Sequence, residues 1–234
     1  ASAGYHIAVY SLEMQGERLG DRWLLAATSG VNPDHLRSGQ LTPDEQQQIH
    51  EASIELSRLP IHIDDNPSVS MDYVRSSAKL LRSKGQCDGI IIDYLQLCDM
   101  KSDQNNRNRE QEVAQASRKA KMLAKELNVP VILLSQLNRN VEGHPDNRPN
   151  LSDLRESGAI EQDADLVLML SRPALSGRAT DRKSTYPTEG LGVIGIAKHR
   201  NGSTGELYFR HDPSMTKLED YVPGIDWMKK NTTP

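Results

Sequence analysis

One run of apolar residues restricts the folds open to this chain more than any other feature. Residues 89–97 read G-I-I-I-D-Y-L-Q-L, so three isoleucines lead directly into Asp93 and a mixed segment that cannot continue a buried strand. An unbroken β-branched run is typical of a central strand in a parallel sheet that is covered on both faces. Ligands bind beyond the carboxyl ends of such strands. The sequence therefore predicts that Asp93 lies at a ligand-binding edge.

Asp93 has two interpretations on these grounds alone. A carboxylate at this edge can orient a hydrated Mg²⁺ that bridges nucleotide phosphates, which is the role of a Walker B aspartate. It can equally cap the next turn, as an aspartate does after many core strands. Asp93 alone does not distinguish the magnesium residue from the capping residue, so other segments of the sequence are needed.

Composition restricts the class of protein. With 234 residues, 36% of them hydrophobic and 26% charged, the chain can bury one sizeable core, and we expect a single domain over residues 1–234. No run approaches about 18 apolar residues and no signal-peptide pattern opens the chain, so we expect a cytoplasmic protein with no membrane span. The two cysteines and seven histidines lack metal-ligand spacing.

Charge is distributed unevenly along the chain. A net charge of -4 argues against a general nucleic-acid binder, which is usually basic overall. However, residues 41–72 hold seven acids and one base, a net of -6, whereas residues 101–125 hold seven bases and three acids, a net of +4. The segregation permits a basic surface on an acidic protein.

Three helices can be predicted from their ends. Thr42-Pro43-Asp44-Glu45 has an N-cap, a proline at the first helical position and a glutamate that can complete a capping box. Ser70 is a second N-cap candidate, ahead of a helix with an apolar stripe. A long helix is expected after the polar segment 101–109, with apolar residues at helical spacing from Val113 to Leu127 and its end at Asn128.

The expected strands alternate with these helices and then become consecutive. They cover residues 6–12, 61–65, 89–93, 129–135, 165–170, 191–197 and 206–210. Asn201-Gly202 favours a turn with positive φ, so the last two strands should form a hairpin. The connection 172–189 is expected to contribute nothing to the core. We therefore predict an α/β fold with a mainly parallel sheet, flanked by helices and ending in an antiparallel edge hairpin.

Polar residues follow four of the expected strands. They are Glu13, Asp93, Gln136 and the pair Lys198 and Arg200. Because parallel strands end at one edge of a sheet, several of these side chains can gather there.

Five segments in order carry a specific resemblance. S-L-E-M at 11–14, I-D-Y-L-Q-L at 92–97, S-Q-L-N-R at 135–139, D-L-R-E-S-G-A-I-E-Q-D-A-D at 153–165 and K-H-R-N-G at 198–202 together resemble the motif series of the DnaB-type replicative DNA helicases. The resemblance implies a RecA-like P-loop NTPase core that uses ATP and Mg²⁺. It also implies a homohexameric ring around single-stranded DNA, with primase and a helicase loader as further partners.

The resemblance also gives roles to the strand-end residues. Glu13 resembles the catalytic glutamate that orients and deprotonates the attacking water. Gln136 resembles the amide that senses the γ-phosphate, and Asp93 resembles the magnesium residue. Without the surrounding motifs, Glu13 could be a solvated acid at a loop entrance, and Gln136 could satisfy backbone groups at a strand end.

Lys198 and Arg200 resemble the cations that reach the γ-phosphate of a neighbouring subunit. Separated by one residue, they should point to the same side of an extended strand. A pair of cations on an edge hairpin can act as an arginine finger in trans. The alternative is a solvated basic edge that discourages strand pairing.

Contacts to DNA are implied for Arg155, Glu156 and Gly158, where glycine permits close approach of the backbone to a phosphate. The alternative for this acidic stretch is a helix with solvated charges. Further candidates are Arg139, Arg148, Arg107 and Arg109. None of these loops contains Phe, Trp or Tyr, so recognition should go through the nucleic-acid backbone and depend on salt.

One element of a P-loop ATPase is not in the sequence. G-x-x-x-x-G-K-[ST], which holds the phosphates, does not occur in the 234 residues. Ala1 to Gly4 stand where the family has the end of the helix after its P-loop. We therefore expect the chain to start just after the phosphate-binding element, to lack the collar domain and linker helix, and to be inactive alone.

Two other functions stay open on sequence grounds. One is a RecA-type recombinase with the same core. The other is a non-catalytic adaptor that uses a RecA-like surface only for binding. A Walker A motif within a few tens of residues upstream would favour the ATPase, and its absence would favour the adaptor.

Overall fold

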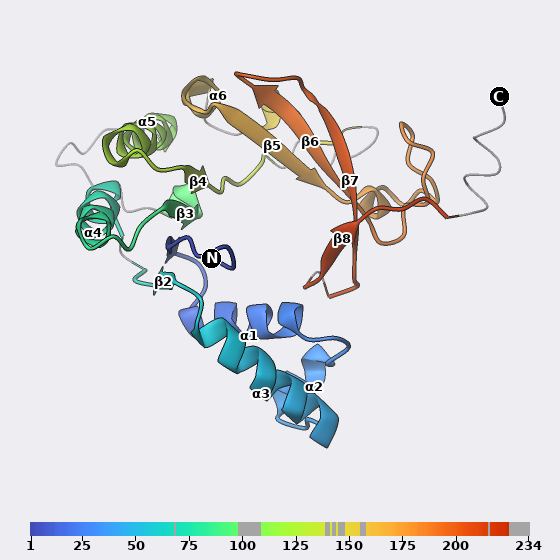
Figure 1. Cartoon of the computed structure of the whole chain (residues 1–234). Helices are drawn as coiled ribbons and strands as arrows, with labels where there is room; N and C mark the ends of the chain where they lie inside the picture. The colour runs from blue at the N-terminus through green and yellow to red at the C-terminus, as the bar shows by residue number, and fades with distance from the viewer. Residues whose placement is uncertain are drawn as a thin grey trace. The chain divides into compact units, whose positions relative to one another are not determined.

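A four-stranded parallel sheet contains the apolar run of residues 89–93. In the computed structural model its strands are β1 (Ile7–Ser11), β2 (Ile61–Asp64), β3 (Gly89–Asp93) and β4 (Val131–Leu133), in the order β2-β1-β3-β4 (Figure 1). Ser11 pairs with Asp93, and Ile92 pairs with Leu133. The predicted parallel sheet is therefore confirmed, with β3 between two neighbours.

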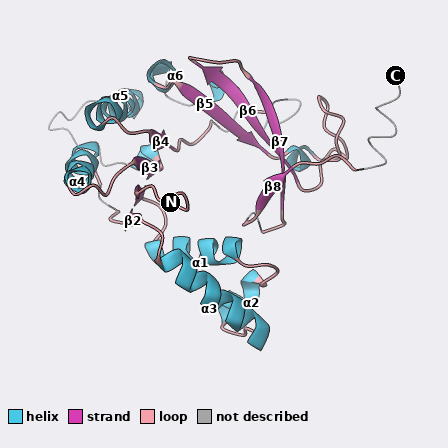
Figure 2. Ribbon diagram, viewed as in Figure 1, coloured by secondary structure: helices cyan, strands magenta, loops and turns pink. Residues whose placement is uncertain are grey.

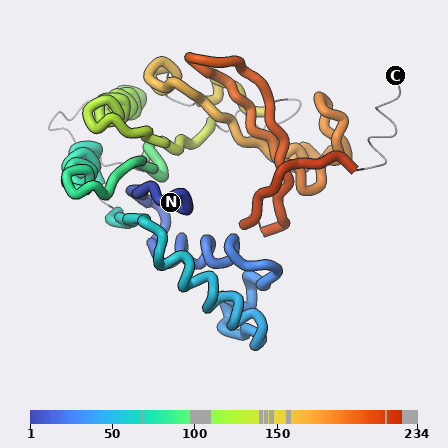
Figure 3. Tube along the Cα trace, in the orientation of Figure 1, coloured from blue at the N-terminus to red at the C-terminus, as the bar shows by residue number. Residues whose placement is uncertain are grey.

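The contacts within the chain divide it into two units. Unit 1 comprises residues 1–136 and 156–163, and unit 2 comprises residues 137–155 and 164–234. The structure describes residues 1–67, 69–97, 109–138, 141, 144, 148–154, 158–214 and 216–224. The tube in Figure 3 allows the chain to be followed through both units.

The core of unit 1 lies between the sheet and two helices. Helix α4 (Met71–Ser83) begins at Ser70, whose side chain accepts from the backbone N–H of Tyr73, and helix α5 (Arg109–Leu127) ends before Asn128 at φ 53°. Both predicted ends are confirmed. Ile90 and Ile92 are fully buried with Val113 and Leu123 in one cluster, whereas Ile91 on the opposite face is half-buried. The run 89–93 thus packs mainly through one face.

Helix α6 (Gly158–Asp163) completes this core although it follows a long stretch of unit 2. Ile160 belongs to the buried cluster, and the Ser117 hydroxyl donates to Asp163 Oδ2 at 3.0 Å. A short 3-10 turn, η1 (Leu95–Leu97), follows β3.

Among the residues that the structure describes, none of the helices is both long and apolar enough to cross a membrane.

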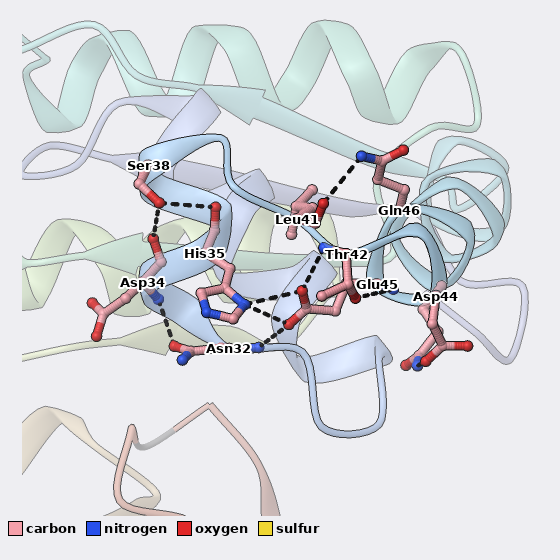
Figure 4. Close-up of polar contacts among 10 residues, drawn as sticks. Asn32, Asp34, His35, Ser38, Leu41, Thr42, Asp44, Glu45 and Gln46 are labelled. Atoms are coloured by element: carbon pink, nitrogen blue, oxygen red, sulfur yellow. Dashed lines mark hydrogen bonds and ion pairs between the residues drawn. The ribbon is translucent and has the colours of Figure 1, made fainter.

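Three more helices form a small assembly of their own between β1 and β2: α1 (Gly16–Ala27), α2 (Pro33–Ser38) and α3 (Pro43–Ser57). The predicted capping box is present, because the N–H of Thr42 donates to Glu45 Oε2 at 2.8 Å and the N–H of Glu45 donates to Thr42 Oγ1 at 3.3 Å. Figure 4 shows that the Glu45 carboxylate also binds the N–H of Asn32 and the His35 ring. One glutamate therefore joins α2 to α3.

Unit 2 is built on an antiparallel sheet. Its strands are β5 (Leu166–Ser171), β6 (Leu191–His199), β7 (Gly205–His211) and β8 (Leu218–Asp220), in sequence order (Figure 2). The predicted hairpin is confirmed as β6 and β7. These strands form a sheet of their own instead of an edge of the parallel sheet, and β5, expected among the parallel strands, pairs antiparallel with β6.

The turn of the hairpin differs from the expectation. Pairing ends at Ile196 and Gly205, and neither Asn201 nor Gly202 has a positive φ. The loop between these partners is long enough to reverse the chain without a tight turn, so left-handed residues are not required.

The connection from β5 to β6 also contributes more than predicted. It contains the 3-10 turn η4 (Pro173–Ser176), and Pro173, Asp181 and Thr188 are buried. A further 3-10 turn, η3 (Leu151–Asp153), belongs to the segment before α6.

Candidate functional site

The carboxyl ends of β1 and β3 lie side by side and place two carboxylates at the same edge. Ser11 and Asp93 are register partners, and the N–H of Leu12 donates to the carbonyl oxygen of Asp93 at 2.7 Å. Glu13 follows Leu12 and is exposed, while Asp93 is half-buried. The parallel pairing therefore brings Glu13 and Asp93 together, as the spacing of polar residues after strands predicts.

Asp93 is in an environment that disfavours its negative charge. Burial raises its pKa above the ordinary value, and the charge of Glu13 raises it further, against an opposing effect of Arg22. A half-buried carboxylate beside a second carboxylate is stabilised as an anion by a cation nearby. The electrostatics of the edge are therefore those of a site that gains from a bound positive charge.

Gln136 lies after β4, and a second amide holds its backbone. The side chain of Gln96 donates to the Ser135 hydroxyl at 2.9 Å, and its Oε1 accepts from the N–H of Gln136 at 3.2 Å. The Gln136 side chain itself is exposed. Gln96 thus links the segment after β3 to the segment after β4.

Gln96 is not among the functional residues predicted from the sequence. The available signal was its place in the I-D-Y-L-Q-L segment, three residues after Asp93. A side-chain amide can donate one hydrogen bond and accept another, so Gln96 can bind the Ser135 hydroxyl and the Gln136 N–H together. An ionised carboxylate could only accept.

The two acids at the carboxyl end of β2 are engaged in structural contacts. Asp65 Oδ2 accepts from the N–H of Gly16 at 2.8 Å, at the start of α1, and Asp64 Oδ2 accepts from the Tyr73 hydroxyl at 2.8 Å. A carboxylate at a helix N-terminus is stabilising because it pairs with an N–H that has no partner within the helix. Glu13, Asp93 and Gln136 remain the strand-end candidates of unit 1.

Lys198 and Arg200 belong to unit 2 and are described within it. Lys198 is in β6 opposite Val167, and Arg200 lies one residue after the strand ends. Arg200 Nη1 is 2.9 Å from Asp165 Oδ1, with both side chains about half exposed. The hairpin therefore presents Arg200 at its turn, held by an ion pair on its own sheet.

The DNA candidates are described only in part. Gly158 is the first residue of α6, whereas Arg155, Glu156, Arg139 and Arg107 lie outside the described residues, as does the side chain of Arg109. The Arg148 side chain is only 14% exposed, and its guanidinium lies 2.6 Å from Asp181. Arg148 is thus no DNA contact in this structure, because a cation enclosed by acids is not available to a phosphate.

A complete metal site made by protein groups alone is not seen in the part of the chain that the structure describes. No three His, Cys, Asp or Glu side chains there come together as metal ligands.

Comparisons with known proteins agree on one family. The model of the DnaB-like helicase C terminal domain matches residues 1–220. A probable replicative DNA helicase of Trieres chinensis is 44% identical over 217 residues, which is 92% of this chain and 47% of that protein. The replicative DNA helicase DnaB of Geobacillus stearothermophilus is 42% identical over 202 residues, 86% of this chain and 43% of that protein. The chain thus spans less than half the length of these relatives.

Solved structures give the same result for the fold. A DnaB-like replicative helicase, solved in a study of its interactions with primase, matches with a TM-score of 0.85 at 31% identity, over 94% of this chain and 52% of that one. A second solved structure, described as an ATPase domain, matches with a TM-score of 0.84 at 31% identity, over 94% of this chain and 76% of that one. With the family match over residues 1–220 and a RecA-like α/β fold, this chain belongs to the family of the DnaB-like helicase C-terminal domain.

Proposed function

We propose that this chain is the motor domain of an ATP-dependent replicative DNA helicase. In this proposal a homohexameric ring encloses single-stranded DNA, moves along it and separates the duplex. The observation that carries the proposal is the placement of Glu13 and Asp93 at the carboxyl ends of adjacent parallel strands, next to the strand that precedes Gln136. Family membership supports the helicase over the recombinase.

Asp93 is suited to hold Mg²⁺ at this edge. It offers a hard oxygen donor, and burial together with Glu13 raises its pKa, so a divalent cation would relieve the unfavourable charge. When bound, Mg²⁺ would neutralise charge on the nucleotide phosphates. Asp93 would orient the hydrated ion, and the strand pairing to Ser11 would fix the position of the carboxylate.

Glu13 and Gln136 are the other two residues of unit 1 with proposed roles in ATP hydrolysis. Glu13 is exposed two residues beyond β1, where it can orient a water molecule and accept its proton. Gln136 can donate from its side-chain amide to a phosphate oxygen, while Gln96 holds its backbone N–H at 3.2 Å. The hydrogen bonds of Gln96 would couple the position of the segment after β3 to that of the segment after β4.

The proposal also assigns roles to the basic residues of unit 2 and names the molecules that the helicase would bind. Lys198 and Arg200 would act in trans at a neighbouring subunit's nucleotide, and Arg155, Glu156, Gly158 and Arg139 would contact single-stranded DNA. Primase is a proposed partner because a structural relative was solved in a study of its interactions with primase. A helicase loader is proposed from the family resemblance alone.

Glu13→Gln provides the test of the proposed function. The 234 residues contain no Walker A motif, so the assays use the full-length protein. Wild-type protein is expected to unwind a forked duplex only with ATP and Mg²⁺. Glu13→Gln should still bind nucleotide but lose at least about a hundredfold in turnover, since general-base catalysis contributes about that much. Glu17→Gln, an exposed acid in the first turn of α1, is the control and should behave as wild type.

The outcomes separate the function from the assignment of Glu13. Wild-type protein that neither hydrolyses ATP nor unwinds DNA would contradict the helicase. An active wild type with an equally active Glu13→Gln variant would remove only the role of Glu13.

The DNA contacts have their own measurement. Arg155→Ala should weaken single-strand binding of the hexamer and reduce the slope of log affinity against log salt by roughly 0.7, the value for one phosphate contact on a single strand. An unchanged affinity and slope would show that this segment does not face the DNA backbone.

A further inference from the structure

A largely enclosed arginine of unit 2, Arg148, has no part in the roles assigned so far. Arg148 Nη2 donates to Asp181 Oδ1 at 2.6 Å, and Nη1 lies 2.8 Å from Glu206 Oε1 in an ion pair. The side chain of Arg148 is 14% exposed and that of Asp181 is 3% exposed. A charge enclosed to this degree is retained only with well-placed partners, since removing one leaves the other buried and unpaired.

The two carboxylates are held in their ionised forms. Burial alone would raise the pKa of Asp181, but hydrogen bonds from Ser184 and Arg148 leave that pKa below its usual value. Burial likewise opposes ionisation of Glu206, whose pKa is nevertheless lowered by Lys183 and Arg148. Arg148 therefore carries its charge between two carboxylates that are ionised at neutral pH.

Arg148 belongs to the segment that leaves Gln136 and leads to α6. This segment is braced internally: the N–H of Asn138 donates to Asp153 O at 2.8 Å, and the N–H of Asn150 donates to Asp153 Oδ2 at 2.7 Å. His144 Nε2 lies 3.5 Å from Asp153 Oδ1. These contacts join Asn138, His144 and Asn150 to Asp153, and Arg148 attaches the same segment of the sequence to residues outside it.

The attachment is made to the turn end of the β6–β7 hairpin. Glu206 is the second residue of β7, directly after the turn that contains Arg200. Asp181 belongs to the connection between β5 and β6. All these residues lie in unit 2, so one guanidinium fastens the loop after Gln136 to the hairpin of Lys198 and Arg200.

We propose that Arg148 is a positioning residue that couples DNA contact to ATP hydrolysis. This inference rests on the proposed function, in which Arg139 and Arg155, before and after Arg148 in the sequence, contact DNA and the hairpin carries the arginine finger. A displacement of Arg148 would reach Arg200 through Glu206, which lies at the turn end of the same hairpin. A loose loop would still contact DNA without placing the finger, and small displacements at a reacting centre cost much of the rate.

Arg148→Met tests the coupling in the complete hexameric protein. The expected result is a loss of roughly tenfold to a hundredfold in turnover stimulated by single-stranded DNA, with KM for ATP and single-strand affinity within about twofold of wild type. Hydrogen exchange should increase within residues 148–154 while strands β5 to β7 stay protected. A purely structural role would lower hexamer yield or raise KM and would not produce this split.

Lys183→Met is the matched control. Lys183 Nζ is 2.8 Å from the same Glu206 Oε1, but its side chain is 63% exposed and does not belong to the loop. Its removal should leave DNA-stimulated turnover within about twofold of wild type. A loss equal to that of Arg148→Met would overturn the coupling, because it would trace the effect to Glu206 alone.

A milder variant covers the case in which Arg148→Met does not assemble. Asp181→Asn keeps an acceptor oxygen for Arg148 but removes the charge, and DNA-stimulated turnover should fall about threefold, the effect of weakening one hydrogen bond. DNA-stimulated turnover that is unchanged in the variant that assembles would overturn the coupling and leave the helicase standing. A wild-type protein whose ATP turnover is not stimulated by DNA would overturn both the coupling through Arg148 and the proposed helicase function.

Discussion

Arg200 and Asp165 are joined through both backbone and side chain. The N–H of Arg200 donates to Asp165 O at 2.8 Å, and Nη1 donates to Asp165 Oδ1 at 2.9 Å. Asp165 immediately precedes β5 and Arg200 immediately follows β6, so the pair closes one end of these strands. Because both side chains are about half exposed, the ion pair contributes at most about 1 kcal/mol. Because this ion pair is weak, the Arg200 guanidinium can leave Asp165 and bind a more highly charged anion such as a nucleotide phosphate.

Arg200→Ala should abolish ATP turnover in the assembled protein. Loss of an arginine finger lowers turnover by at least about a thousandfold, whereas loss of an exposed ion pair hardly affects folding. ATP hydrolysis and the hexamer fraction by light scattering are the two measurements. Arg210→Ala, an exposed arginine of β7, should leave both unchanged. Normal turnover of the Arg200 variant would place the finger elsewhere.

Asp93→Asn should separate stability from activity. The folded-state pKa of Asp93 is raised, so its ionised form destabilises the fold at neutral pH. This cost shrinks as the pH falls through the folded-state pKa and is gone below the unfolded-state pKa. The amide removes the cost, so we expect a higher unfolding temperature in the absence of Mg²⁺. Turnover should fall at least about a hundredfold, because the ion loses its carboxylate.

The effect of Mg²⁺ on unfolding checks the same residue without any turnover. A ligand that binds only the folded state raises the unfolding temperature with its concentration. Wild-type protein should show this rise in the presence of nucleotide, and Asp93→Asn should show a smaller one. Equal rises in both proteins would exclude Asp93 as the magnesium residue.

The capping box of α3 should be visible in the pH dependence of stability. Hydrogen bonds from the Thr42 and Asn32 backbone and from His35 lower the pKa of Glu45 from 4.5 to about 2. The ionised glutamate therefore stabilises the fold above its unfolded-state pKa, and this contribution is lost as the pH falls through about 2. Denaturant unfolding should show Glu45→Gln less stable than wild type near neutral pH, with the difference shrinking on acidification. A constant difference would contradict this linkage.

Two further variants isolate the cap from general surface charge. Thr42→Ala removes the side-chain acceptor and should cost about 1 kcal/mol at all pH values. Glu51→Gln changes an exposed acid on the same helix and should change stability by no more than about 0.5 kcal/mol.

Neighbouring residues of α5 should differ sharply in their contribution to stability. Leu123 is 1% exposed in the core of unit 1, and Met122 beside it is 61% exposed. Leu123→Ala should cost about 2–5 kcal/mol of unfolding free energy, since the cavity and the lost apolar contacts add. Met122→Ala should stay within about 0.5 kcal/mol. Similar losses in the two variants, measured by urea unfolding, would contradict the packing of α5 against the sheet.

The sequence predicted those parts of the fold that local chemistry decides. The capping box of Thr42 and Glu45 depends on residues three apart, and the end of α5 at Asn128 depends on one residue that tolerates positive φ. The edge with Glu13 and Asp93 was predictable because parallel strands must end together. In each case a short stretch of sequence contains all the partners.

Features that depend on distant partners were missed or wrongly placed. The sheet of β5 to β8 is separate because β5 pairs with β6, which starts twenty residues after β5 ends. Arg148 was proposed as a DNA contact, and only its ion pair with Asp181, 33 residues away, reveals its burial. Gln96 joins Ser135 across 39 residues. Alternation and motif spacing contain no information about such pairs.

Helix α6 has a consequence for how this protein is made. It belongs to unit 1, yet residues 137–155 of unit 2 come before it and residues 164–234 of unit 2 come after it. A ribosome therefore cannot complete unit 1 until it has also synthesised the first part of unit 2. No single cut in the gene separates the two units, because a fragment that stops at Gln136 leaves Ser117 without Asp163 and the cluster without Ile160.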